Sequence, residues 1–167
     1  NCVVMGMIGV GWQGSGNMGN FLNQSTSQVV AVCDVDQKHL DDAVKSVNDH
    51  YKNQDCKAYH DYREMLARTD IDAVMIATPD HWHALAAVEA ARQGKDIFGE
   101  KPLAHSIAEQ QAIVKAVQQH QRIWQTGSWH RSQRNFHYAA EIVLKGLVGT
   151  IQRVEVGLAA GHADLAR

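Results

Sequence analysis

Three glycines with a telling spacing follow the first apolar run of the chain. Val3–Ile8 leads directly into Gly9-Val10-Gly11-Trp12-Gln13-Gly14. In this G-x-G-x-x-G pattern the first glycine permits a tight turn and the second lets the backbone approach a pyrophosphate. The third lets the following helix pack close to the strand. The start of that helix carries unpaired N–H groups and the positive end of its dipole, so the pattern indicates a site for a dinucleotide.

An acidic residue supports this interpretation. Asp34 lies 20 residues beyond Gly14, at the end of the apolar run Val29–Cys33. A carboxylate there accepts hydrogen bonds from the adenosine ribose, each worth about 1.5–3 kcal/mol. A second match to the same spacing, Gly14-Ser15-Gly16-Asn17-Met18-Gly19, begins inside the predicted helix and is less well placed. The alternative is a glycine-rich turn of another α/β protein, with Asp34 as a solvated turn residue.

Short apolar runs alternate with helical patterns and would position these residues. The predicted strands are Val3–Ile8, Val29–Cys33, Ala73–Ala77, Asp96–Phe98, Ile123–Thr126 and Ile151–Val156. The predicted helices are the segment after Gly14, Asp36–Tyr51, Asp61–Arg68, His83–Arg92, Ser106–Gln121 (with Ser106 and Glu109 as a capping box) and the apolar stripe from Phe136 to Leu147. This alternation predicts an α/β fold with a doubly wound parallel sheet, in which ligands bind where the strands end.

Composition excludes several classes of protein. The 167 residues carry a net charge of −2 and no long basic run, which disfavours nucleic acid and acidic membrane surfaces as partners. No apolar stretch approaches the roughly 20 residues that span a bilayer. Three cysteines without a C-x-x-C motif argue against a disulfide framework. Ten histidines are present, but no cysteine or carboxylate cluster completes a tetrahedral set, so we expect no metal site.

Two further segments carry a resemblance to a known protein family. Thr78-Pro79-Asp80-His81-Trp82-His83 follows one predicted strand, and Gly99-Glu100-Lys101-Pro102 follows the next. With the glycine turn and Asp34, they resemble the Gfo/Idh/MocA family of NAD(P)-dependent oxidoreductases over almost the whole chain. The segments 125–131 and 146–151 look like the end of that family's cofactor domain.

The resemblance implies roles for particular residues. Gly9, Gly11 and Gly14 would cradle the pyrophosphate, with backbone N–H groups from Trp12 and Gln13. Asp34 would hold the adenosine ribose. Further along the cofactor, the implied contacts are Thr78, Pro79 and His83 in the middle, Glu100 and Lys101 by the nicotinamide ribose, and Arg131 at the far rim.

Lys101 is the predicted catalytic residue. A lysine at this sheet edge can hydrogen-bond an alcohol oxygen, and its cation stabilises negative charge that develops there. The competing interpretation is a surface lysine paired with Glu100. Trp82 and Trp129 could form an aromatic wall or simply pack. Asp34 favours NAD, because a carboxylate repels a 2′-phosphate, while nearby Lys38 leaves NADP open.

The resemblance also implies a domain arrangement. Residues 1–150 would form the cofactor-binding Rossmann domain and residues 151–167 the start of a second, largely absent α/β domain. The expected reaction is hydride transfer to or from a hydroxyl of a sugar or cyclitol, in a homo-oligomer. The alternatives are an NAD-dependent glycoside hydrolase that works by transient oxidation, or a non-enzymatic NAD-binding domain. We expect a cytoplasmic protein, or a periplasmic one if a signal peptide has been removed.

Overall fold

The computed structural model describes residues 2–157 and divides the chain into two compact units. The first is Asn1–Ser128 and the second is Trp129–Arg167. Among residues 2–157, every helix is too short or too polar to cross a membrane.

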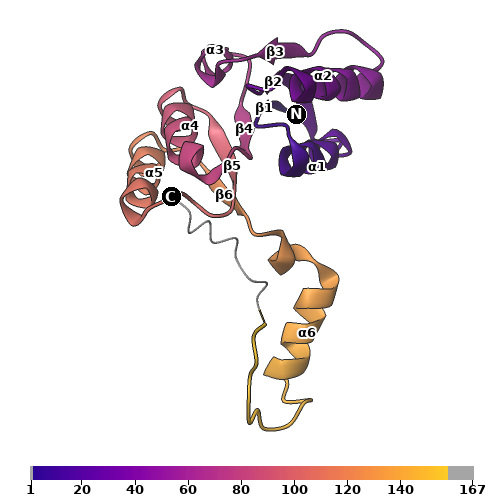
Figure 1. Cartoon of the computed structure of the whole chain (residues 1–167), viewed down its shortest axis with the longest axis vertical. Helices are drawn as coiled ribbons and strands as arrows, with labels where there is room; N and C mark the ends of the chain where they lie inside the picture. Colours follow the sequence, from indigo (N-terminus) through magenta and orange to yellow (C-terminus); the bar gives the residue numbers. More distant parts are fainter. Residues whose placement is uncertain (1, 158–167) are drawn as a thin grey trace, which may run out of the picture. The chain divides into compact units, whose positions relative to one another are not determined.

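The first unit is built on a six-stranded parallel sheet (Figure 1). The strand order is β3-β2-β1-β4-β5-β6, so the chain builds outward from β1 to one edge and then returns to build toward the other. The strands are β1 (Val3–Ile8), β2 (Ser27–Cys33), β3 (Lys57–Tyr59), β4 (Ala73–Ile76), β5 (Asp96–Glu100) and β6 (Trp124–Gly127). The helices are α1 (Trp12–Leu22), α2 (Gln37–Tyr51), α3 (Tyr62–Leu66), α4 (Asp80–Arg92) and α5 (Ile107–Gln119). The predicted doubly wound fold is confirmed.

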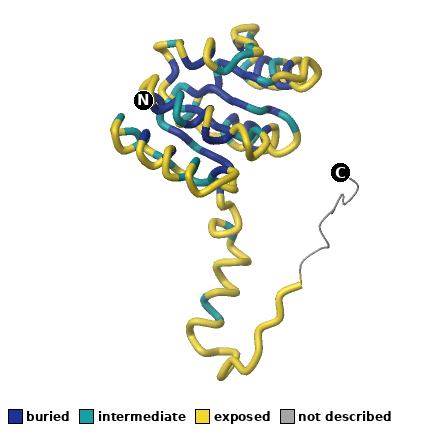
Figure 2. Tube along the Cα trace, turned by 60° about the vertical axis from the view of Figure 1, so that its left-hand side comes forward, coloured by how far each residue is buried: buried dark blue, intermediate teal, exposed yellow. Residues whose placement is uncertain are grey.

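Two hydrophobic clusters lie on opposite faces of the sheet. Residues of β1 alternate between them: Met5 and Met7 pack with α1 and α2, whereas Ile8 packs with α3, α4 and α5. Most residues of the central strands β1, β4 and β5 are buried, and the dark tube in the interior of this unit in Figure 2 marks buried residues. Coverage on both faces explains why the strand sequences are apolar runs without polar alternation.

Side chains cap the starts of α2 and α5. Asp36 accepts a hydrogen bond from the His39 N–H at the start of α2. Ser106 and Glu109 form the predicted capping box at the start of α5, where Glu109 N–H donates to Ser106 and Ser106 N–H donates to Glu109. These bonds satisfy N–H groups that a helix leaves unpaired in its first turn.

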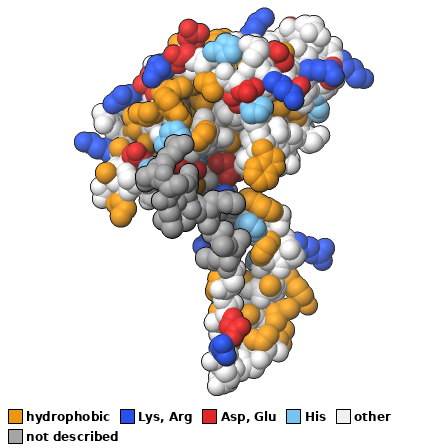
Figure 3. Space-filling view, viewed as in Figure 1, with side chains coloured by type: hydrophobic (Ala, Val, Ile, Leu, Met, Phe, Trp, Pro, Cys, Tyr) orange, Lys and Arg blue, Asp and Glu red, His pale blue; other side chains and the backbone are white. Residues whose placement is uncertain are grey.

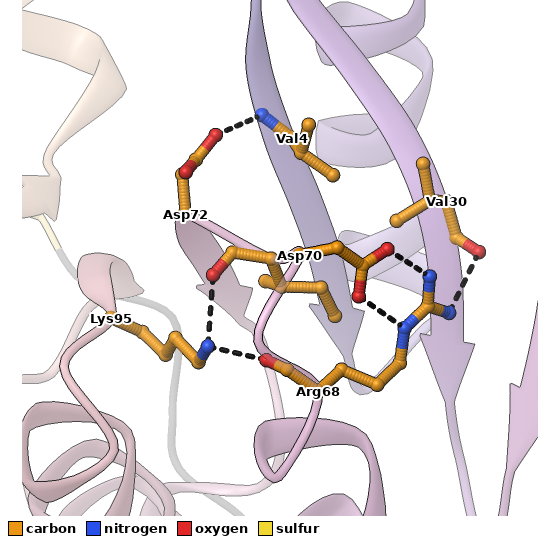
Figure 4. Close-up of polar contacts among 7 residues, drawn as sticks. Val4, Val30, Arg68, Asp70, Asp72 and Lys95 are labelled. Atoms are coloured by element: carbon orange, nitrogen blue, oxygen red, sulfur yellow. Dashed lines mark hydrogen bonds and ion pairs between the residues drawn. The ribbon is translucent and has the colours of Figure 1, made fainter.

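A polar cluster joins the amino ends of the strands (Figure 4). The buried Lys95 ammonium donates to the carbonyl oxygens of Arg68 (2.5 Å) and Ile71 (2.9 Å), and burial lowers the pKa of Lys95. Asp72 accepts from the Val4 N–H at 2.8 Å. The cluster therefore fixes the edge of the sheet that lies opposite the predicted site.

Several predicted elements differ from the structure. Strand β3 was not predicted, because Lys57–Tyr59 is a three-residue strand with two exposed members at the sheet edge. Helix α4 begins at Asp80, three residues before the predicted start, because Pro79 serves as its N-cap residue. The strand predicted at 151–156 is wrong: those residues form no regular structure and are exposed. No strand lies beside them in the described part of the second unit, so their backbone groups have no ladder to join.

The second unit contains the short 3-10 helix η1 (Trp129–Ser132) and α6 (Arg134–Leu144). The apolar stripe predicted from Phe136 onward is helical through Leu144, but its side chains are exposed, as Figure 3 shows along α6. Residues 158–167, which include most of the predicted start of a second domain, lie outside the described residues. The predicted boundary at residue 150 stays a prediction.

Candidate dinucleotide-binding site

The ends of five strands form one row across the sheet. In the parallel register Ile8 pairs with Cys33 on one side and with Ile76 on the other. Ile76 then pairs with Gly99, and Glu100 pairs with Gly127. The glycine turn, Asp34, Thr78 and Lys101 each follow one of these ends, so all four lie at the same edge of the first unit.

The glycine turn requires its first and third glycines for steric reasons. Gly9 has a φ of +78°, and a Cβ there would lie 2.8 Å from the backbone of Ala77 and Thr78. A Cβ on Gly14 would lie 1.9 Å from the carbonyl oxygen of Gly9. Gly16 and Gly19, in contrast, have open space around them inside α1. The first glycine set is therefore the one that shapes the turn.

Helix α1 begins with free hydrogen-bonding capacity toward this edge. Its N-cap residue is Gly11, which has no side chain to cap the helix, and no acidic residue occupies the first turn. The N–H groups at Trp12 and Gln13 therefore lack the usual side-chain acceptors. Trp12 is 94% exposed and Gln13 is also exposed. This geometry suits an anion such as a phosphate.

Asp34 is held in a fixed orientation by the main chain. One carboxylate oxygen accepts from the Val10 N–H at 2.8 Å, and the other accepts from the Asp36 N–H at 3.0 Å. The ring of His39 lies 3.8 Å from the second oxygen and also faces Gly11. The carboxylate is thus attached to the glycine turn and presented beside it.

A pocket of about 620 Å³ opens at this edge. Five residues of the predicted site line it: Gly9, Gly11, Asp34, Thr78 and Pro79. The remaining lining residues are Ile8, Cys33, Val35, Asp36, His39, His60, Asp61, Tyr62, Arg63, Ala77, Trp82 and Ala86. A pocket with apolar walls and a few fixed polar groups is typical of cofactor sites.

Individual groups in the pocket suit a nucleotide. The Thr78 hydroxyl is buried and has no hydrogen-bond partner among residues 2–157, so it can pair with a bound molecule. In the wall of the pocket, Val35 is largely exposed and Trp82 is partly exposed, and both offer apolar surface to a base. Burial, followed by the charge of Asp34, raises the pKa of Cys33 to about 12, which leaves that thiol unreactive at neutral pH.

Glu100 and Lys101 lie farther along the same edge. Glu100 is 4% exposed and accepts from Asn17 Nδ2 at 2.8 Å, whereas Lys101 is exposed. Among residues 2–157 no ion pair joins Lys101 to a carboxylate. The alternative of a surface pair between Lys101 and Glu100 therefore has no support in the described residues.

His83 connects two of the loops that follow strands. Its ring is 3% exposed, and its two nitrogens lie 2.8 Å from the Thr78 carbonyl oxygen and 2.7 Å from the Pro102 carbonyl oxygen. It does not line the pocket. The ring links the loop after β4 to the loop after β5, which carries Lys101.

The sequence did not predict every residue of the pocket, and some residues that it did predict do not line the pocket. His39 and His60 line the pocket, whereas Lys38, on which the NADP alternative depended, does not. Asn17 holds Glu100 across 83 positions of the sequence, a distance over which no local pattern operates. Arg131 lies in η1 of the second unit, so its role stays a prediction, as does that of Trp129.

A family model matches the sequence of the first unit. The Gfo/Idh/MocA family model, described as an oxidoreductase family with an NAD-binding Rossmann fold, matches residues 3–128. The chain belongs to the Gfo/Idh/MocA oxidoreductase family. The expected family, fold and NAD-binding character are thereby confirmed. The match covers all but the first two residues of the first unit, including the glycine turn, Asp34 and Lys101.

The chain is similar to glycosyl hydrolase family 109 proteins in sequence and to inositol dehydrogenases in structure. The chain is 37% identical over 123 residues to glycosyl hydrolase family 109 protein 2 of Shewanella sp. (strain ANA-3), an alignment that covers 72% of this chain and 27% of the relative. The structure of myo-inositol 2-dehydrogenase from Lactobacillus plantarum matches with a TM-score of 0.80 at 27% identity, over 90% of this chain and 43% of that one.

Scyllo-inositol dehydrogenase from Lactobacillus casei, solved with NAD(H) and scyllo-inositol, matches with a TM-score of 0.78 at 26% identity, over 89% of this chain and 43% of that one. The chain thus spans about a quarter of the length of the curated relative and less than half of the structural ones.

Proposed function

We propose that this chain is the cofactor domain of an NAD-dependent oxidoreductase that acts on a hydroxyl of a sugar or cyclitol. The observation that carries the proposal is the shared sheet edge, where the glycine turn, Asp34 and Lys101 follow the ends of β1, β2 and β5. The inositol dehydrogenases among the structural relatives support a cyclitol as the substrate class.

The residues fit an NAD molecule on three counts. Gly9 and Gly11 bring no side chain of their own to the pocket beside the start of α1, so phosphates can approach the N–H groups there. The Asp34 carboxylate, fixed by Val10 and Asp36, can accept from the ribose hydroxyls. A carboxylate at this place repels a 2′-phosphate, which favours NAD over NADP.

Lys101 is the residue we assign to the reacting hydroxyl. When bound, the nicotinamide ring supplies the hydride acceptor or donor. The exposed Lys101 ammonium follows β5 at the same edge and is free of carboxylate partners within residues 2–157, so it can hydrogen-bond the alcohol oxygen. That bond orients the alcohol, and the ammonium stabilises the negative charge that develops on the alcohol oxygen.

Calorimetric titration of the chain with NAD tests the binding part of the proposal. Asp34→Asn is expected to weaken binding by about 10- to 100-fold, because it removes the charge from bonds to the ribose. Asp72→Asn is the matched control: Asp72 also accepts an N–H from an end of β1, but at the opposite edge of the sheet. Equal affinity of wild type and Asp34→Asn, or no binding by wild type, would refute the assignment.

Turnover tests the role of Lys101. In a longer form of the protein that includes the second domain, NADH formation from inositols and hexoses should be lost in Lys101→Met, while NAD affinity stays close to that of wild type. Retained turnover in Lys101→Met would refute the role assigned to this residue at the reacting hydroxyl. We further propose a homo-oligomer, with a second domain beginning near residue 151.

Glycoside hydrolysis through transient oxidation is a second candidate. It is favoured by the 37% identity to family 109 glycosyl hydrolases. Both candidates need NAD in the same pocket, so NAD binding does not separate them. Release of the aryl group from aryl glycosides without net NADH formation would select the hydrolytic function.

A further inference from the structure

The Glu100 carboxylate is enclosed at the end of β5 without a cationic partner among residues 2–157. It is 4% exposed, and none of the ion pairs in that range includes it. A Cβ on Gly127 would lie 2.9 Å from its Oε1 atom, so β6 closes one side of the carboxylate. Because a buried charge is unfavourable unless it is hydrogen-bonded, the groups that donate to Glu100 determine its placement.

The two oxygens of Glu100 serve different elements. Oε1 accepts from Asn17 Nδ2 at 2.8 Å and from Gln13 Nε2 at 3.4 Å, both in α1. Oε2 accepts from the Lys101 N–H at 3.1 Å. The carboxylate therefore connects the helix that begins at the glycine turn to the backbone of Lys101.

Asn17 is the stronger of the two donors, and its orientation is fixed. Its Oδ1 accepts from Gln13 Nε2 at 3.2 Å, which leaves Nδ2 directed at Glu100. The residue is 9% exposed, so water is not a ready substitute. Reversing the amide would place an oxygen against the carboxylate and lose both bonds.

We propose that Asn17 is a positioning residue for Lys101, acting through Glu100. The proposal rests on the proposed function, in which Lys101 meets the reacting hydroxyl. The helix that presents its first turn to the phosphates then also sets the backbone position of the lysine. Binding of the dinucleotide and placement of Lys101 are coupled through two side chains that do not line the pocket.

The amide exchange rate of Lys101, measured by NMR in the free chain, tests the proposal. Asn17→Asp replaces the donor with a second carboxylate oxygen facing Glu100, and the Lys101 amide is expected to exchange about tenfold faster. Asn48→Asp is the matched control, because Asn48 is also a buried asparagine, in α2, and its Nδ2 donates to Gln54 outside the site. It should leave the Lys101 rate unchanged.

Exchanging the amide and the carboxylate between positions 17 and 100 provides a rescue experiment for the Lys101 exchange rate. In the double variant Asn17→Asp with Glu100→Gln, the introduced amide can donate to the introduced carboxylate and still accept from the Lys101 N–H. The rate should therefore return to that of wild type. Asn17→Ala, which removes the donor without adding charge, should accelerate exchange in the same direction and serves if Asn17→Asp fails to fold.

Two outcomes would overturn the proposal: an unchanged Lys101 rate in folded Asn17 variants, or the same acceleration in Asn48→Asp, which would indicate general loosening. Failure of the double variant to restore the rate would exclude Glu100 as the link. Because exchange is measured without NAD, failure of the wild-type chain to bind NAD would refute the proposed function separately.

Discussion

The third glycine of the turn offers a sharp stability test. Gly14→Ala and Gly16→Ala place the same methyl group in the same helix, two positions apart. At position 14 the new Cβ would lie 1.9 Å from the Gly9 carbonyl oxygen, whereas at position 16 it would meet nothing within 4 Å. The two variants share helix propensity and differ in steric environment, so the contrast isolates the close approach of α1 to the turn.

The expected magnitudes have opposite signs. In Gly14→Ala the helix must retreat from the turn by about 1 Å to relieve the clash. Because the clash is with backbone, we expect a loss of about 3 kcal/mol or more. Gly16→Ala removes a flexible residue from an exposed helical position and should add about 0.5–1 kcal/mol. For a chain of this length these changes correspond to a fall in Tm of roughly 6–12 °C and a rise of about 1–4 °C.

Urea denaturation followed by circular dichroism measures both variants, and calorimetry with NAD measures the turn itself. Gly14→Ala should also lose NAD affinity, since the turn moves with the helix. Gly19→Ala, with open space like Gly16, serves as a second control. A Gly14→Ala protein as stable as wild type, or a Gly16→Ala protein with the same loss, would refute the steric account.

Three further predictions concern stability. Because the folded state holds the pKa of Cys33 at about 12 while the unfolded thiol titrates near 9, stability is lost as the pH rises above 9. Between pH 7 and 10 the free energy of unfolding of wild type should fall by about 1.4 kcal/mol more than that of Cys33→Ala, and parallel curves would contradict this. Lys95→Met leaves the Arg68 and Ile71 carbonyl oxygens without their donor, so we expect a loss of about 1–3 kcal/mol in urea melts and no change in NAD affinity. Ser106→Ala removes the α5 cap and should lower stability by about 1 kcal/mol; an unchanged Tm would show that the capping box is dispensable.

The elements that carry the site were predictable because each has a local signal. Val3–Ile8 is an apolar strand followed by glycines, and Asp36 and Ser106 are cap residues followed by helical patterns. Strand β3 has no such signal, since Lys57–Tyr59 is short, mostly exposed and gains its structure only by pairing with β2. The predicted strand at 151–156 is the reverse case. Its sequence has an apolar pattern, but no strand among the described residues pairs with it.

The candidate site was predictable where spacing constrains it. The strand ends had to share one edge once the sheet was parallel, which placed Asp34 and Lys101 with the glycine turn. The contacts of Asn17 with Glu100 and of His39 with Gly11 depend on how α1 and α2 pack on the sheet. Such contacts join residues far apart in sequence, so a single sequence contains no pattern for them.

The main-chain bonds to Asp34 have a thermodynamic consequence for ligand capture. The Val10 and Asp36 N–H groups already restrain both carboxylate oxygens before any nucleotide arrives. The side chain therefore loses its rotational entropy when the protein folds, so this loss does not reduce the free energy of binding. Binding of the ribose should therefore require little rearrangement of this side chain. Substitutions around the carboxylate should change the dissociation rate constant of the nucleotide more than its association rate constant.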